Sequence, residues 1–297
     1  MRFGVMAMQM ASLVPADLGP EEMQDYASTF DHAELVRGLH QEGFALIELG
    51  GDLGMFIPQA FRPPAVQALG VLKEELGLAY TVHLPLWSVE PSTPLRSVRE
   101  GSVAALVDAI EATYPLKPEV YVIHATGALA AEFASMRLPA QGKGLILRQF
   151  QQAATESLRA ILIETGLPSR QLAVETIEFP FELTLEMAEA LDLSMCLDVG
   201  HVLSGFSGQL GLFEVLDACV PRLAEVHLHD APIPRAGGVV YGRDHRPLGE
   251  GDLDVGRFLD RLEELAFEGP VIFELTVAEA KASLALVASL RPHLVDT

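Results

Sequence analysis

Short apolar segments that end in an acidic residue or a histidine recur along this chain. The six segments are 80–83, 121–124, 172–175, 194–201, 225–229 and 271–274. Each has the length and composition of a buried β-strand, with its polar residues toward the carboxyl end. Because charged side chains are seldom buried without a partner or a metal ion, six such ends predict one shared polar site built from distant parts of the sequence.

Strand and helix patterns alternate along the whole chain. Strands are expected at residues 2–8, 44–49, 80–83, 120–124, 172–175, 195–198, 224–229 and 271–274. Amphipathic helices are expected between them, at 31–40, 64–76, 97–112, 145–164, 183–191 and 212–219, with two more after residues 254 and 276. Asp31, Asp254 and Thr276 can cap three of these helices, and Ser97 with Glu100 fits a capping box.

This alternation predicts an α/β fold. Short apolar strands between amphipathic helices are typical of a parallel sheet covered on its faces, and eight strand–helix units close into a barrel. We therefore expect a single (β/α)8 TIM barrel that spans residues 1–297. A doubly wound open sheet is the alternative, but no Gly-rich phosphate loop follows the first expected strand.

The charge balance limits the partners that the chain can bind. It has 41 Asp and Glu residues against 20 Lys and Arg, a net charge of -21 at pH 7. Because phosphate backbones attract basic surfaces, neither a nucleic acid nor an anionic membrane is expected as a partner. A small-molecule substrate is expected instead, and the chain could form a homo-oligomer.

A cytoplasmic location is also expected. No apolar segment reaches the roughly 18 residues that a membrane-spanning helix needs. Residues 1–16 could be mistaken for a signal peptide, but removing them would leave the barrel one strand short. The two cysteines, Cys196 and Cys219, fit buried free thiols in a reducing compartment.

The candidate site residues follow from the barrel prediction, because catalytic groups lie at the carboxyl ends of barrel strands. The candidates there are His83, His124, Glu175, Asp198, His201, His227, His229 and Glu274. Carboxylates combined with imidazoles suit Zn, Mn or Fe, and the absence of a cysteine ligand disfavours a structural zinc site. His227 and His229 are two residues apart and face the same side of a strand, so we expect one of them as a ligand and the other facing the substrate. Glu175, Glu274 and His229 are the candidate catalytic groups.

A long Gly-rich loop follows the seventh expected strand. It contains residues 242–245, Gly-Arg-Asp-His, and residues 247–251, Pro-Leu-Gly-Glu-Gly. A loop of this length on the catalytic face is more often functional than merely solvated. Asp244 and His245 are therefore candidate ligands for an additional metal ion. Arg243 and Arg246 are candidates for binding a substrate phosphate, although surface ion pairing is the more common use of such residues.

Several motifs in the second half of the chain resemble those of a known family. They are Asp198-Val-Gly-His201, His227-Leu-His-Asp230, Pro247-Leu-Gly-Glu-Gly251 and the final Glu274. They are similar to motifs of the xylose isomerase-like TIM barrels, the AP endonuclease 2 superfamily, which includes endonuclease IV and sugar-phosphate isomerases and epimerases. The resemblance implies that a first divalent metal ion is held by Glu175, Asp198, His227 and Glu274.

The endonuclease-like branch of this superfamily has further ligands. The resemblance implies that His83, His124 and His201, with an Asp and a His from the loop, complete a centre of up to three metal ions. His245 matches the loop histidine. The family's loop reads Asp, one residue, His, whereas Asp244 directly precedes His245 here, which leaves the identity of the loop carboxylate open.

A narrower resemblance is to the cobamide-remodelling phosphodiesterases of the same superfamily. It rests on residues 80–85 (Tyr-Thr-Val-His-Leu-Pro), 114–118 (Tyr-Pro-Leu-Lys-Pro) and 242–245 (Gly-Arg-Asp-His). This resemblance implies that the substrate is a bulky anionic small molecule, the nucleotide loop of a corrinoid, inside the cell.

Two enzyme functions are compatible with these candidates. The leading hypothesis is a metal-dependent hydrolase that cleaves a phosphodiester in a small anionic metabolite, with two or three Zn, Mn or Fe ions per chain. The second is a sugar-phosphate or ketose isomerase or epimerase, in which Glu175 and Glu274 move a proton as acid and base beside one ion. A barrel that binds a ligand without turnover is least favoured, because the acids at the fifth, sixth and eighth expected strands are intact.

Overall fold

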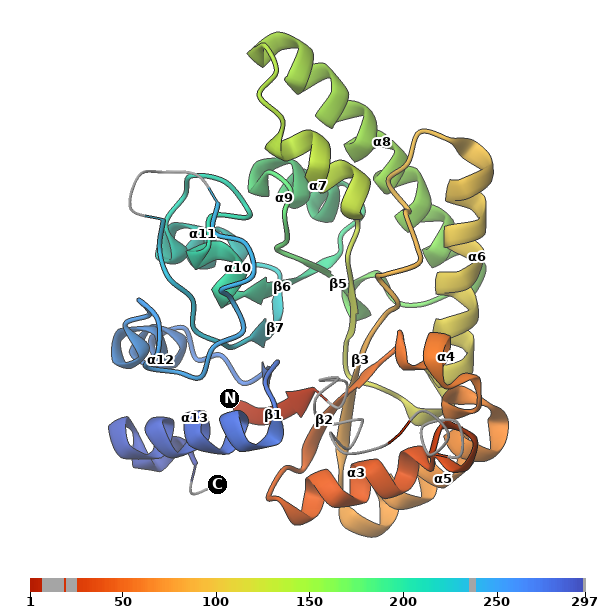
Figure 1. The fold of residues 1–297 in the computed structure, drawn as a ribbon, viewed down its shortest axis with the longest axis vertical. Coiled ribbons are helices and arrows are strands. Elements are labelled where there is room, and N and C mark those ends of the chain that lie inside the picture. The colour runs from red at the N-terminus through yellow and green to blue at the C-terminus, as the bar shows by residue number, and fades with distance from the viewer. Residues whose placement is uncertain (7–18, 20–25, 235–238, 296–297) are drawn as a thin grey trace.

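The computed structural model describes residues 1–6, 19, 26–234 and 239–295. Eight strands pair side by side in sequence order, and β1 also pairs in parallel with β8, so the sheet closes into a barrel. Figure 1 shows the strands at the centre of the molecule and the helices around them. The predicted (β/α)8 fold is confirmed.

The strands are short and nearly all of their residues are buried. Their bounds are β1 Arg2–Met6, β2 Leu46–Gly50, β3 Ala79–His83, β4 Tyr121–Ile123, β5 Leu172–Glu175, β6 Ser194–Asp198, β7 Leu223–His227 and β8 Pro270–Phe273. One face of each strand packs on the helices and the other fills the barrel, so both faces need apolar residues. This double burial is the reason that continuous apolar runs in the sequence mark the strands.

The helices pack their apolar faces on the outside of the barrel. The α-helices are α3 His32–Gln41, α4 Leu53–Phe56, α5 Pro63–Leu76, α6 Arg96–Thr113, α7 Ala128–Ser135, α8 Ala140–Thr165, α9 Phe181–Ala190, α10 Val199–Leu203, α11 Leu212–Cys219, α12 Val255–Glu264 and α13 Val277–Leu290. The short 3-10 helices are Pro58–Phe61, Tyr114–Leu116, Ser169–Gln171 and Pro292–Leu294. In α12, for example, the buried Val255, Phe258 and Leu262 share one face of the helix.

Three of the predicted helix caps are confirmed. Asp31 and Asp254 accept hydrogen bonds from backbone N–H groups in the first turns of α3 and α12. Thr276 and Glu279 form a capping box at the start of α13. These polar contacts satisfy backbone donors that the first turn of a helix leaves without a partner.

Other predicted boundaries are wrong. The capping box expected at Ser97 does not form, because α6 already begins at Arg96 and Ser97 lies inside its first turn. α8 begins at Ala140 rather than at 145, and its first turns were missed because its buried residues start only at Leu147. β1 ends at Met6, and residues 7–8, which were expected to continue it, lie outside the described residues.

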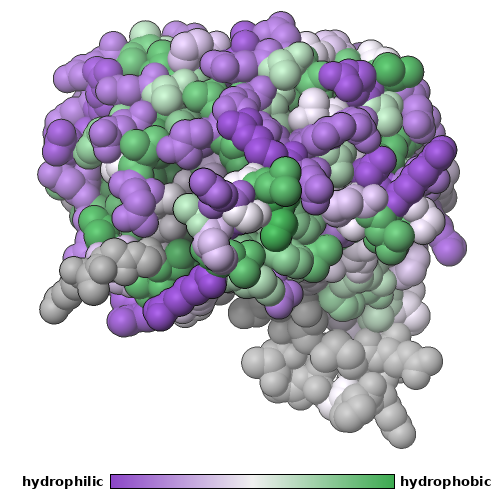
Figure 2. Space-filling view, turned by 90° about the horizontal axis from the view of Figure 1, so that it is seen from above, coloured by the Kyte–Doolittle hydropathy of each residue, from purple (hydrophilic) through white to green (hydrophobic). Residues whose placement is uncertain are grey.

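Figure 2 shows hydrophilic and hydrophobic residues interspersed over one face of the molecule. Among the residues that the structure describes, no helix is both long enough and apolar enough to cross a membrane.

Cys196 and Cys219 are free and buried, as predicted.

Candidate metal centre

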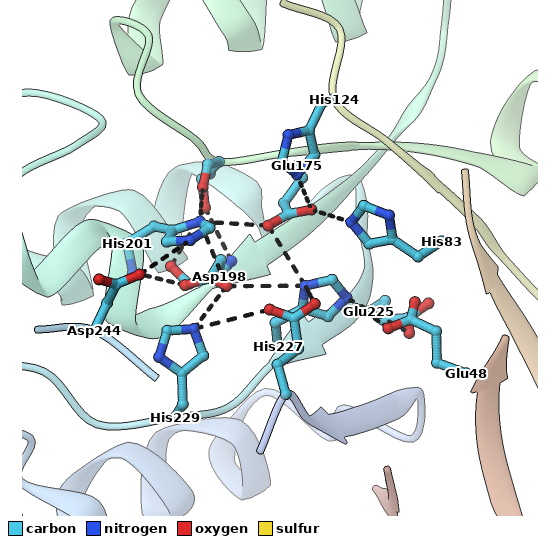
Figure 3. Close-up of polar contacts among 12 residues, drawn as sticks. Glu48, His83, His124, Glu175, Asp198, His201, Glu225, His227, His229 and Asp244 are labelled. Carbon is cyan, nitrogen blue, oxygen red and sulfur yellow. Dashed lines mark hydrogen bonds and ion pairs between the residues drawn. The ribbon is translucent and has the colours of Figure 1, made fainter. Parts of the chain in front are cut away.

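The carboxyl ends of β3 to β8 bring their polar side chains together at one end of the barrel (Figure 3). Among the described residues, four groups have ligand atoms within 4.8 Å of one another, and three of them are built from these side chains and the loop histidine; the fourth is Glu48, Glu225 and His227. The three groups are Glu175, Asp198, His227 and Glu274; His83, His124 and Glu175; and His201, His229 and His245. The structure therefore assembles the candidates of the strand ends and the loop histidine into one centre.

Glu175 of β5 joins two of these groups. Its Oε2 lies 3.1 Å from Nε2 of His83 and 3.0 Å from Nε2 of His124. Its Oε1 lies 3.5 Å from Nδ1 of His227 and 3.4 Å from Nδ1 of His201. A carboxylate with one oxygen in each of two ligand groups is placed to bridge two cations.

Asp198 ends β6 and at once begins α10. Its Oδ1 accepts the backbone N–H of His201 at 2.6 Å, so it caps this short helix. The helix turns the His201 side chain back toward Glu175. The Asp-Val-Gly-His motif is therefore a strand end and a helix cap that place two ligands side by side.

His83 and His201 each place Nδ1 against a backbone carbonyl oxygen. Nδ1 of His83 lies 2.9 Å from the carbonyl oxygen of Leu84, and Nδ1 of His201 lies 3.1 Å from that of Thr176. A carbonyl oxygen only accepts, so each Nδ1 carries a proton. Nε2 is then the nitrogen of each ring that can bind a cation.

The side chain of His229 contacts both the end of β6 and the loop that follows β7. Its Nε2 lies 2.9 Å from Oδ2 of Asp198, and its Nδ1 accepts the backbone N–H of His245 at 2.9 Å. The ring of His229 also stacks on that of His245, with centroids 4.0 Å apart. His229 is fully buried, so its contacts are those of a positioning residue, and its catalytic role stays a prediction.

Gly200 leaves the space that the His229 ring occupies. A Cβ at this position would lie 2.1 Å from Cε1 and Nδ1 of His229. Gly200→Ala is therefore expected to displace the ring, weaken metal binding and lower the free energy of unfolding by about 1–3 kcal/mol, the usual cost of overpacking. Thermal unfolding and competition with a chelator measure the two effects.

The matched control is Gly38→Ala in α3, where nothing lies within 4 Å of an added Cβ. This change is expected to stabilise the protein by about 0.5–1 kcal/mol, because Ala loses less backbone entropy than Gly in a helix. A Gly200→Ala protein with wild-type stability and metal affinity would show that the His229 ring has room to move.

Asp230 holds the loop that carries the last two candidate ligands. Its carboxylate accepts three backbone N–H groups at 2.8 to 3.0 Å, from Ala231, Gly249 and Leu253. A Cβ on Gly251 would lie 2.2 Å from Oδ1 of Asp230, which accounts for the last glycine of the Pro-Leu-Gly-Glu-Gly motif. Asp230 also exchanges two backbone hydrogen bonds with Arg246, next to the ligand pair.

The loop brings both Asp244 and His245 to the centre. Oδ2 of Asp244 lies 2.8 Å from Nδ1 of His245 and 3.9 Å from Nε2 of His201. Nε2 of His245 lies 3.3 Å from Oε2 of Glu274. His245 adopts a left-handed backbone conformation with φ of 54°, which is uncommon for a residue other than glycine. Such strained backbone conformations are found most often at functional sites. The sequence left the identity of the loop carboxylate open, because Asp244 directly precedes His245. In the structure, Asp244 is a loop carboxylate that reaches the centre.

The donor set fits divalent cations. Oε1 of Glu175 and Nδ1 of His227 are buried, have no hydrogen-bond partner among the described residues, and lie 3.5 Å apart. A buried polar atom without a partner costs roughly 1–3 kcal/mol, which a cation between these atoms would offset. Buried carboxylates combined with imidazoles and no cysteine suit Zn, Mn or Fe.

The histidines and carboxylates of the centre shift one another's titration. Burial lowers the pKa of His83 and His201, but the neighbouring carboxylates outweigh it and raise the pKa to about 9 and about 10. In the same way Asp244 and Glu274 raise the pKa of His245 to about 11. Burial raises the pKa of Glu175, but His124 and His227 outweigh it and hold the pKa well below its usual value. Without metal, protonated histidines neutralise the acids.

The stability of the metal-free protein is therefore expected to fall as the pH rises above 6.5. A histidine whose folded-state pKa exceeds its unfolded value of 6.5 stabilises the fold fully below pH 6.5 and loses this contribution as the pH rises toward 9 to 11. The affinity for metal ions is expected to rise over the same pH range, because protons no longer compete with the metal for the histidine nitrogens.

Thermal unfolding of chelator-treated and metal-loaded protein between pH 6.5 and 10 measures this effect. The difference in Tm between the two forms is expected to widen with pH. Comparing the forms at each pH removes the contribution of surface groups that titrate in both. A difference that stays constant or narrows would argue against protonated histidines as the counter-charge.

The centre opens into a cavity of about 890 Å³. His83, His124 and Glu274 belong to its lining, which also includes an apolar part. The apolar part contains Leu86, Trp87, Val89, Val98 and Ile177. Among the described residues that line the cavity there is no Lys or Arg, whereas Glu90, Glu178 and Asp244 add acidic groups.

The two arginines predicted to bind substrate do not line this cavity. Arg243 is exposed, and Arg246 donates from its guanidinium to the backbone carbonyl of Glu250. Their role in substrate binding stays a prediction that the cavity does not support.

Two buried acids near the centre were missed by the sequence analysis. Glu48 of β2 and Glu225 of β7 are completely buried and lie beside His227. Burial and the nearby Glu48 carboxylate raise the pKa of Glu225 well above its usual value. An acid in the middle of an apolar strand, as in Leu-Ile-Glu-Leu-Gly of β2, is the signal that could have found them.

Residues 36–292 match the model of a protein family described as xylose isomerase-like TIM barrel. The chain belongs to this family. The match confirms the resemblance that the sequence motifs predicted and covers every candidate ligand from His83 to Glu274.

Known relatives of this xylose isomerase-like barrel include the uncharacterized protein MJ1311 of Methanocaldococcus jannaschii. The two are 24% identical over 215 residues, which cover 71% of this chain and 69% of that protein. Among solved structures, a D-tagatose 3-epimerase-like protein has a TM-score of 0.71 at 18% identity, over 100% of this chain and 99% of that chain. Endonuclease IV from Thermus thermophilus has a TM-score of 0.65 at 22% identity, over 99% and 100%. At these identities the structures show the fold alone.

Proposed function

We propose that the protein is a metal-dependent hydrolase that cleaves a phosphodiester in a small anionic metabolite. The observation that carries this proposal is the engagement of both oxygens of Glu175 and of Glu274. Oε1 of each lies about 3.5 Å or less from Nδ1 of His227, while Oε2 faces His83 and His124 in one case and His245 in the other. Such carboxylates are suited to bridging cations.

The ligand groups support two or three ions. When bound, two or three divalent cations would lower the pKa of a water molecule to about 7 and neutralise the charge that develops on the phosphoryl oxygens. The first would be held by Glu175, Asp198, His227 and Glu274. His83 and His124 with Glu175 would hold a second, and His201, His245 and Asp244 would complete the set.

The cavity supports a bulky small-molecule substrate. Its volume of about 890 Å³ lies near the upper end of the roughly 300–1,000 Å³ range of small-molecule pockets. Because the described lining has no Lys or Arg, the positive charge that meets an anionic diester would come from bound cations rather than from side chains. A duplex nucleic acid would need basic residues around the cavity, and the net charge of -21 disfavours it.

The apolar part of the cavity supports a substrate with a large uncharged portion. Trp87 is half exposed and packs edge-on against Phe56 of α4, with ring centroids 5.8 Å apart. Leu86 and Ile177 line the same cavity. The nucleotide loop of a corrinoid combines a bulky body with one phosphodiester, which makes a cobamide the first substrate to test.

An isomerase or epimerase is the second candidate. It is favoured by Glu175 and Glu274, whose Oε1 atoms lie 3.5 and 3.4 Å from Nδ1 of His227, an arrangement compatible with an acid–base pair around one ion. The contacts of Oε2 disfavour the isomerase. Oε2 of Glu175 faces His83 and His124, and Oε2 of Glu274 faces His245. An acid–base pair needs a carboxylate oxygen that is free to exchange a proton with the substrate.

The metal content per chain of protein purified without chelator is the experiment that tests the proposal. Two or three Zn, Mn or Fe ions per chain, measured by elemental mass spectrometry, are expected, together with release of the nucleotide loop from a cobamide. One exchangeable ion with conversion of a ketose or its phosphate would establish the isomerase instead. Protein that binds no ion after soaking in these metals would refute both functions.

A further inference from the structure

Two buried glutamates, in addition to the proposed metal ligands, lie inside the barrel. Glu48 comes from β2 and Glu225 from β7, and neither side chain is exposed. Figure 3 shows both beside the His227 ring, on the side away from Asp198. Neither acid lines the cavity, so neither can contact a substrate there.

His227 lies between two sets of carboxylates. Its Nδ1 faces the metal-type ligands, 3.4 Å from Oε1 of Glu274 and 3.9 Å from Oδ2 of Asp198. Its Nε2 faces the other way, 3.4 Å from Oε2 of Glu48 and 4.0 Å from Oε1 of Glu225. The imidazole is completely buried, so it is not exposed to bulk solvent.

A histidine that binds a cation through one nitrogen carries a proton on the other, and that N–H needs an acceptor. His83 and His201 use backbone carbonyl oxygens for this purpose. For His227, no backbone carbonyl of the described residues accepts from Nε2, which lacks any hydrogen bond within normal limits. Of the two carboxylates beside Nε2, that of Glu48 is the nearer, at 3.4 Å against 4.0 Å for Glu225.

Glu48 is also the acid with more free acceptor capacity. Neither of its oxygens has a hydrogen-bond partner among the described residues, whereas only Oε2 of Glu225 is without one. Glu225 also lies farther from the imidazole, and its Oε1 already accepts the hydroxyl of Thr81 at 3.1 Å. The two acids are of the same type and equally buried, but only one is placed to accept from His227.

We propose that Glu48 is a positioning residue for the metal centre, which accepts the Nε2–H of His227 and so directs the Nδ1 lone pair to the first metal ion. The negative charge of Glu48 also raises the basicity of the imidazole. This inference rests on the proposed metal site but not on the reaction that the site performs. It adds β2, a strand without a direct ligand, to the parts of the barrel that set metal affinity.

The test compares metal affinity in three variants, measured with Zn(II) in competition with a chromophoric chelator. Glu48→Leu removes the acceptor and is expected to weaken binding by about 10- to 100-fold, the usual effect of losing such an outer partner. Glu48→Gln keeps an acceptor without the charge, so a smaller loss is expected. Glu225→Gln is the matched control and is expected to bind Zn(II) as wild type does.

Two further measurements separate positioning from a structural role. The Tm of metal-free Glu48→Leu is expected to equal or exceed that of wild type, because an apolar residue replaces a buried acid. The absorption spectrum of the Co(II)-loaded Glu48→Leu protein is expected to change more than that of Glu48→Gln, because only Leu removes the acceptor that orients the His227 ligand. Either variant suffices for the comparison if the other does not fold.

Wild-type Zn(II) affinity in the Glu48 variants would overturn the proposal, and so would an equal loss in Glu225→Gln, which would trace the effect to buried charge in general. The proposed function fails separately. Wild-type protein that binds no metal refutes the metal centre, whereas metal-loaded protein that cleaves no diester refutes the hydrolase and leaves the role of Glu48 intact.

Discussion

Glu175→Gln is expected to remove at least one metal ion per chain and to slow phosphodiester hydrolysis on the order of 10³-fold, the upper end of what one lost transition-state contact costs. The carboxylate oxygens of Glu175 face His83 and His124 on one side and His227 and His201 on the other. An amide keeps one oxygen and replaces the other with NH2, which cannot bind a cation. The bridge between two ligand groups is therefore lost while the size of the side chain is kept.

Metal content and the rate of bis(4-nitrophenyl) phosphate hydrolysis, with a cobamide as the second substrate, measure this effect. Glu182→Gln, an exposed acid in the first turn of α9, is the control and is expected to behave as wild type. A Glu175→Gln protein that keeps two or more ions and at least a tenth of the activity would show that Glu175 is not a bridging ligand.

The sequence predicts the barrel and the ligands for the same physical reason. A strand buried on both faces reads as an apolar run, so an acid or histidine at its end stands out. Asp198 and His227 are directly paired across β6 and β7, and Gly50 is paired with His83 across β2 and β3. Residues at matching positions of neighbouring strands meet at one end of a parallel barrel, so the ligands converge without any further information.

Contacts that depend on three-dimensional packing could not be predicted in this way. Glu48 and Glu225 lie inside the strands rather than at their ends, so they were not recognised as neighbours of His227. Ser97 has the sequence of a cap, but the helix begins one residue before it. The backbone contact between His245 and His229 depends on how the loop folds around Asp230, and no local pattern reports it.

His245→Ala is expected to remove one ion from a centre of two or three and to slow hydrolysis by about 10²-fold, the cost of losing one stabilising contact. The Ala variant loses the imidazole between Asp244 and Glu274 but keeps the backbone N–H that His229 accepts. The loop is therefore expected to keep its position, and the loss reports on the ring alone. His293→Ala, a mostly exposed histidine that pairs with Glu263, is the matched control.

The metal count of His245→Ala also decides between the two candidate enzymes. A single-ion isomerase needs only Glu175, Asp198, His227 and Glu274, none of which this change removes. Such an enzyme would keep its full metal content and lose little activity. A hydrolase with ions in the outer ligand groups would lose an ion at an otherwise intact first site. Loss of every ion would mean instead that His245 supports the first site through its 3.3 Å contact with Glu274, in which case the loop is part of the minimal metal centre.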